Sequence, residues 1–148
     1  MKRINKYNEK MVTHADTGVT LPYIGYKFTK GRKSRYRKEI RKYGFASPET
    51  WDLNETASVW LYSHIKMMLD IGGEIVDFYY PFTLPEQEDK ALAELGVPLP
   101  LRGSAGDIFD FICSLLEEAK ATDDEDRSFK LTTTAFHIFA IMLPYAWW

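Results

Sequence analysis

The residues best suited to chemistry are the cations clustered between positions 27 and 43. This segment is dense in Lys and Arg, with aromatic side chains interspersed. Guanidinium and ammonium groups neutralise phosphates, and tyrosine rings can stack on nucleobases. The segment therefore predicts binding of a phosphate-bearing ligand, a nucleic acid or a nucleotide. The candidate phosphate- and base-binding residues are Lys30, Arg32, Lys33, Arg35, Tyr36, Arg37, Lys38, Arg41, Lys42 and Tyr43.

A second interpretation of the same cations stays open. Residues 1–50 hold 13 Lys and Arg against 4 Asp and Glu, a net charge of +9. Residues 51–148 hold 6 Lys and Arg against 17 Asp and Glu, a net charge of −11. Such a split suggests a basic segment attached to an acidic body. The basic segment would then meet an outside polyanion, stay solvated, or dock on the acidic helices of its own chain or of another copy.

A metal-dependent nucleotide hydrolase is a second alternative function, because two acidic clusters could supply carboxylates to a metal ion. Glu117 and Glu118 are followed by the run Asp123–Asp126. Helical nucleotide pyrophosphatases bind Mg²⁺ through carboxylates spaced three or four residues apart on facing helices. Consecutive acids at a helix end point in several directions, so a solvated acidic turn is favoured here. We expect no catalytic residue, metal or other cofactor, and a binding protein is favoured over an enzyme.

The remaining polar candidates favour structural roles. The three histidines, His14, His64 and His137, have no metal-ligand spacing. Cys113 is the only cysteine, so no disulfide can form within the chain and a reducing compartment is expected. It falls beside an apolar helical face with no base near it in sequence, which predicts a buried structural thiol.

The tryptophans divide into two pairs. Trp51 and Trp60 belong to a helical pattern and are expected in the core. Trp147 and Trp148 end the sequence, where they would be tied down or would form an exposed aromatic patch that needs a partner. The alternative function is therefore a protein-interaction module that uses Trp147 and Trp148 to form a homo-oligomer or to inhibit a host protein.

The N-terminal half contains the elements that must position the cations. Residues 1–26 predict an irregular or extended lead-in, and residues 34–41 a short helix that ends before Gly44. Ser47-Pro48-Glu49 predicts a separate helical turn or a tight corner. A capping box of Asp52 and Glu55 opens a long helix that Gly72-Gly73 ends. The apolar stripe expected for this helix comprises Leu53, Ala57, Trp60, Leu61, His64, Met68 and Ile71.

The C-terminal half predicts further helices. Residues 74–82 would be a strand or an extended connection, residues 83–96 contain a short helix, and a loop with Pro98, Pro100, Gly103 and Gly106 follows. Asp107 would cap the next helix, and the acidic turn leads into a last helix that Pro144 ends. Their expected apolar faces comprise Ile108, Phe111, Ile112, Leu115 and Ala119 in the first helix, and Phe129, Phe136, Phe139 and Leu143 in the last.

The fold class is therefore mainly α, a small helical bundle with an irregular basic N-terminal arm. We expect a single helical domain over residues 1–148, with the arm at 1–43 and the helical body at 44–148. The longest apolar stretch, 136–148, is too short to span a bilayer, so we expect a cytoplasmic protein with no membrane partner.

One stretch of the sequence resembles a known group of proteins. The pattern begins with Tyr43-Gly44-Phe45 and a turn with proline, and it continues with Thr50-Trp51-Asp52-Leu53-Asn54 and a helix with Ala57 and Trp60-Leu61. This pattern resembles small proteins of tailed phages and prophages, several of which also end in Trp-Trp. The resemblance implies a phage origin and a helical fold but no reaction, because none is assigned to those proteins. The expected function is a non-enzymatic phage accessory protein that acts in the host cytoplasm.

Overall fold

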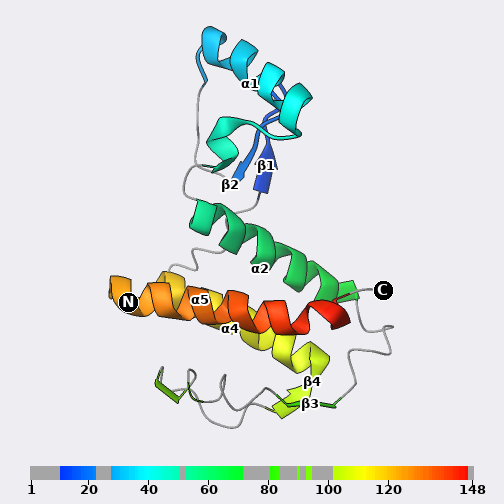
Figure 1. The fold of residues 1–148 in the computed structure, drawn as a ribbon, viewed down its shortest axis with the longest axis vertical. Helices are drawn as coiled ribbons and strands as arrows, with labels where there is room; N and C mark the ends of the chain where they lie inside the picture. The colour runs from blue at the N-terminus through cyan, green and yellow to red at the C-terminus, as the bar shows by residue number, and fades with distance from the viewer. Residues whose placement is uncertain are drawn as a thin grey trace. The chain divides into compact units, whose positions relative to one another are not determined.

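Most of the predicted helices are present in the computed structural model (Figure 1). The structure describes residues 11–22, 28–50, 53–71, 81–83, 90, 93–94 and 102–146. The chain forms two compact units, which are described separately. The N-terminal unit comprises residues 7–63, and the C-terminal unit comprises residues 1–6 and 64–148.

The N-terminal unit begins with a small hairpin. Strand β1 (Met11–Thr13) pairs antiparallel with β2 (Thr20–Pro22). The connecting turn is closed by hydrogen bonds between the backbones of His14 and Val19 and of Gly18 and His14, at 2.8 and 2.7 Å. Gly18 has a φ of 80°, a left-handed conformation that glycine adopts at little cost. The lead-in predicted as irregular or extended thus contains a short paired sheet.

Helix α1 (Lys30–Tyr43) and the short 3₁₀ helix η2 (Ser47–Thr50) complete the basic part of this unit. Both were predicted, although α1 begins four residues earlier than residue 34. Its core is small: Val19, Leu21, Tyr36 and Ala46 are buried, and Phe28 and Ile40 pack against them. The basic segment is therefore held by a hydrophobic cluster of its own.

The C-terminal unit is built on two long helices, α4 (Ala105–Ala121) and α5 (Glu125–Met142), which pack closely against each other. Only three residues connect them, and this short connection makes a helical hairpin (Figure 1). Strands β3 (Pro81–Thr83) and β4 (Arg102–Ser104) pair antiparallel and pack beside α4. The 3₁₀ helix η5 (Leu143–Tyr145) follows α5.

Helix α2 (Leu53–Ile71) runs through the boundary between the two units. Within the C-terminal unit, Lys66 of α2 forms an ion pair with Asp110 of α4 at 3.0 Å. The predicted caps of this helix, Asp52 and Gly72-Gly73, lie outside the described residues. Trp51, all of residues 74–80 and most of residues 84–101 also lie outside them.

The mainly α fold class is confirmed: the described part has four α-helices and a small N-terminal hairpin. The predicted single domain, with its division at residue 43, stays a prediction.

Two structural details were wrong. Ser104, not Asp107, is the N-cap of α4, and Asp107 is the third residue of the helix, whose side chain completes the capping box. Arg102–Ser104 is a strand rather than a loop, and it pairs with Pro81–Thr83.

Two predicted apolar faces were also wrong in part, although Leu61 of the predicted α2 stripe is buried. Trp60, expected in the core, is 47% exposed, and the buried residues of α2 include Val59, Leu61 and Ile65. In α5, Phe129 is 68% exposed and Leu143 is exposed as well. The buried residues of α5 follow a different stripe: Leu131, Ala135, Ile138 and Met142. The predicted face of α4 is correct apart from Phe111, which is only partly buried.

Candidate phosphate-binding surface of helix α1

Helix α1 forms without the usual acidic N-terminal turn, and its C-terminal end is well defined. Its first turn has no Asp or Glu, and Thr29 at the N-cap makes no side-chain capping hydrogen bond. Arg41 and Lys42 lie in the last turn, where positive charge interacts favourably with the helix dipole. Gly44, with a φ of 84°, ends the helix and donates its N–H to the carbonyl of Ile40 at 2.8 Å.

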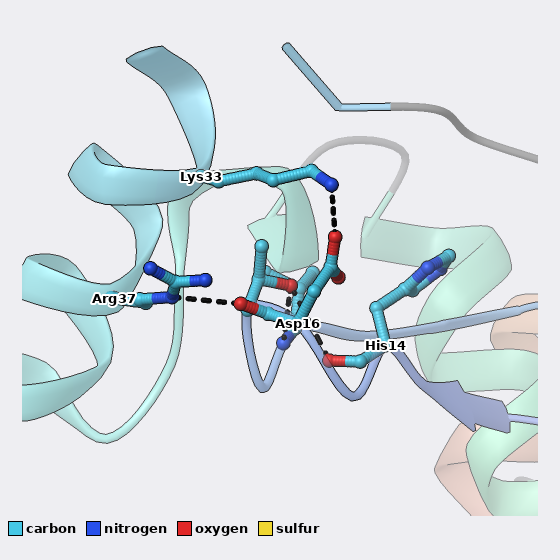
Figure 2. Close-up of polar contacts among 6 residues, drawn as sticks. His14, Asp16, Lys33 and Arg37 are labelled. Carbon is cyan, nitrogen blue, oxygen red and sulfur yellow. Dashed lines mark hydrogen bonds and ion pairs between the residues drawn. The ribbon is translucent and has the colours of Figure 1, made fainter. Parts of the chain in front are cut away.

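One side of α1 is fastened to the turn of the hairpin. Lys33 forms an ion pair with the carboxylate of Asp16, and the Nε of Arg37 donates to the backbone carbonyl of Asp16 at 2.7 Å (Figure 2). The hydrogen bond from Lys33 holds the pKa of the Asp16 carboxyl below its usual value. Lys33 and Arg37 are one helical turn apart, so a single aspartate positions two successive turns of α1.

A second carboxylate, Glu39, fastens α1 to η2. Its Oε2 accepts from the backbone N–H of Ser47 at 2.7 Å, and its Oε1 accepts from the Nε of Arg35 at 2.8 Å. The hydrogen bonds from Ser47, followed by that from Arg35, lower the pKa of the Glu39 carboxyl. Of the predicted phosphate-binding cations, Lys33 and Arg35 are therefore already paired with carboxylates of the same unit.

The other cations face solvent. All of them are exposed, and Lys30, Arg32, Lys38 and Arg41 form no ion pair with any residue of the described ranges. Helical spacing places Lys30 and Arg41 in the same stripe of α1 as Arg37, and Lys38 and Lys42 next to this stripe on the side away from Lys33. We call Lys30, Lys38, Arg41 and Lys42 the outward face. The helix contains eight Lys and Arg and one Glu, so its net charge is +7.

The two candidate stacking tyrosines have opposite environments. Tyr36 is 3% exposed and meets Phe28 edge-on, with ring centroids 5.2 Å apart. Its ring is part of the core, so the expectation that it stacks on a ligand is corrected. Tyr43 is 57% exposed, and its ring centroid lies 6.4 Å from that of Phe45, which is 48% exposed. Phe45 was not among the predicted site residues.

The other candidates show no convergent chemistry. No group of three or more His, Cys, Asp and Glu in the described part of the chain could hold a metal ion. Glu118 forms an ion pair with Arg127, and Asp124 caps α5 by accepting from the Arg127 N–H. Cys113 is fully buried, as predicted, and burial raises the pKa of its thiol to about 12. His64 and His137 are exposed rather than part of the core.

The predicted partner-binding residues Trp147 and Trp148 lie outside the described residues. No helix that the structure describes is long and apolar enough to cross a membrane. Comparisons with protein-family models, curated proteins and solved structures found no match to this chain. The resemblance to phage proteins therefore stays a prediction, and the function must be argued from the surface of α1.

Proposed function

We propose that this protein binds the phosphate backbone of a nucleic acid through the outward face of α1. The observation that carries this proposal is the separation of the cations of α1 into two sets. Lys33 and Arg35 have carboxylate partners in the N-terminal unit, whereas Lys30, Lys38 and Arg41 are exposed with no carboxylate partner in the described ranges. Lys33 holds the helix to Asp16 and Glu39 holds it to Ser47, whereas the second set is available to an outside anion.

The arrangement of the outward face favours a polymer over a mononucleotide. Lys30 and Arg41 are eleven residues apart in the same helix, a separation of roughly 16 Å along its axis. A mononucleotide site needs groups that converge on one or two phosphates, whereas these side chains project from the convex surface of a helix. A strand with regularly spaced phosphates can contact several of them at once, and each contact releases counterions.

The test is a salt series of fluorescence-anisotropy titrations with a labelled oligonucleotide. The double variant Lys38→Gln/Arg41→Gln removes two charges from the outward face. Its matched control, Lys120→Gln/Lys130→Gln, removes two charges from α4 and α5 and leaves the same net charge on the protein. We expect the first variant alone to reduce the slope of log K against log salt by about 1.4 to 1.8.

Two results would contradict the proposal. One is that the wild-type protein shows no salt-sensitive binding. The other is that both double variants weaken binding equally. Equal weakening would mean that overall charge, not the face of α1, determines the affinity. The phage origin, the host cytoplasm and the interaction role of Trp147 and Trp148 stay predictions.

A further inference from the structure

We infer that the aromatic pair Tyr43–Phe45 is a stacking platform for an unpaired base, which makes the ligand of α1 a single-stranded nucleic acid. This inference rests on the proposed function, because the cations of α1 must first bring the strand to the surface. It goes beyond that function by naming the form of the nucleic acid and a residue, Phe45, that recognises it.

The rings of Tyr43 and Phe45 do not contribute to the core. The buried cluster of the N-terminal unit is formed by Val19, Leu21, Tyr36 and Ala46, with Phe28 and Ile40 packed against it. Tyr43 and Phe45 are outside this cluster and about half of each side chain is in contact with solvent. Their planes are inclined by 36°, so the two rings offer neighbouring apolar surfaces rather than one stacked pair.

The backbone on both sides of the aromatic pair holds it in place. The left-handed Gly44 lies between the two residues and is bonded to Ile40. Immediately after Phe45, the N–H of Ala46 donates to Glu49 Oε1 at 2.9 Å and the N–H of Ser47 donates to Glu39. A rigid aromatic surface loses little conformational entropy when a ligand binds to it.

Positive charge lies beside the two rings. The Nζ of Lys42 lies 4.8 Å from the centroid of the Tyr43 ring, and Arg41 precedes it in the last turn of α1. A nucleotide whose base stacks on one of these rings therefore brings its phosphate close to two cations. Aromatic rings beside a basic track are the usual arrangement for binding single strands without sequence preference. In a duplex the bases are stacked on one another, so the rings would have no base to contact.

The experiment compares three probes of equal length, about 12 units long. One is an oligothymidylate, one is an abasic strand with the same phosphates but no bases, and one is a duplex. We expect the wild-type protein to bind oligothymidylate about fivefold to tenfold more tightly than the abasic strand, as one stacked base would provide. We expect the duplex to bind no more tightly than the abasic strand.

The decisive variant is Tyr43→Leu/Phe45→Leu, which keeps apolar side chains but removes both aromatic faces. It should bind oligothymidylate and the abasic strand equally, with the salt dependence of the wild-type protein. The control Phe129→Leu removes an exposed ring from α5 and should keep the preference for bases. Circular dichroism of each variant establishes that it is folded.

The outcomes separate the two proposals. If the wild-type protein binds all strands in a salt-sensitive way but does not prefer bases, or if it prefers the duplex, the stacking inference is overturned and the phosphate-binding function stands. If the leucine variant keeps the preference, the inference is also overturned. If no probe binds, the proposed function itself fails.

Discussion

Helices α1 and α4 are similar in length but use their side chains in opposite ways. Of the 14 residues of α1, Tyr36 is the only one that is buried, whereas α4 buries eight of its 17 residues. Helix α4 is therefore stabilised mainly by apolar contacts along its length. Helix α1 is held by one buried ring and by polar contacts to Asp16 and Ser47. Most side chains of α1 are thus left at the surface, while those of α4 form the core.

The largest effect that tests this comparison is expected from Phe109→Ala in α4. Phe109 is completely buried, so truncation removes apolar contacts and leaves a cavity. We expect the free energy of unfolding to fall by about 3 to 5 kcal/mol. The matched change in α1, Lys38→Ala, alters an exposed side chain and should stay within about 0.5 kcal/mol. Urea denaturation followed by circular dichroism measures both, and similar losses in the two helices would contradict the comparison.

The contrast also explains how much of the structure could be predicted from the sequence. The positions of α1, η2, α4 and α5 follow from propensity, glycine and proline signals, which are local. The buried stripe of α5 could not be chosen in this way, because its residues fit two stripes: Phe129, Phe136 and Leu143, or Leu131, Ala135, Ile138 and Met142. Helix α4 packs on the second stripe, and that choice depends on a partner helix rather than on periodicity.

The candidate site, too, could be predicted only where local sequence signals determine it. The charge of α1 was evident from composition, but the division into paired and exposed cations was not. Asp16 lies 17 residues before Lys33, and no local pattern connects them. Phe45 could have been found, because a glycine between two aromatic residues at the end of a basic helix indicates a turn that brings the two rings together. The cap of α4 could also have been found, since Ser104 and Asp107 have the spacing of a capping box.

A smaller effect is expected at the contact between the hairpin and α1. Gly18 has a φ of 80°, and a Cβ added there would lie 3.3 Å from Cδ1 of Ile40. We expect Gly18→Ala to destabilise the N-terminal unit by about 1 kcal/mol or more, because alanine is strained in this conformation. The matched control is Gly31→Ala in α1, where a Cβ would meet nothing within 4 Å. That substitution should be neutral or stabilising by about 0.4 to 1 kcal/mol.

Thermal denaturation of the two glycine variants gives the sign of each change. A loss of stability in Gly18→Ala would support a close fit between the hairpin and α1. A gain of stability in Gly31→Ala would show that the backbone of α1 itself tolerates alanine. A Gly18→Ala protein as stable as the wild type would show that the hairpin adjusts its position on α1, which would contradict a close fit between Gly18 and Ile40.

The smallest expected effect concerns Glu39, the single carboxylate of α1. Its pKa is lowered in the folded protein by the N–H of Ser47 and by Arg35. An unfolded Glu has a pKa of about 4.3, so the stabilisation from ionised Glu39 is present above that pH and is lost as the pH falls through the lower folded value. We expect Glu39→Gln to be less stable than the wild type at pH 7, and the difference to be smaller at pH 3. Denaturant midpoints at the two pH values measure it.

The control Glu94→Gln changes an exposed carboxylate and should alter neither midpoint noticeably. Glu39→Gln also separates the two roles of α1, because it removes a fold contact and raises the net charge of the helix from +7 to +8. Where the variant is folded, its affinity for an oligonucleotide should equal or exceed that of the wild type. Weaker binding would mean that Glu39 contributes to recognition, and the division of α1 into residues that fasten it and residues that bind would be wrong.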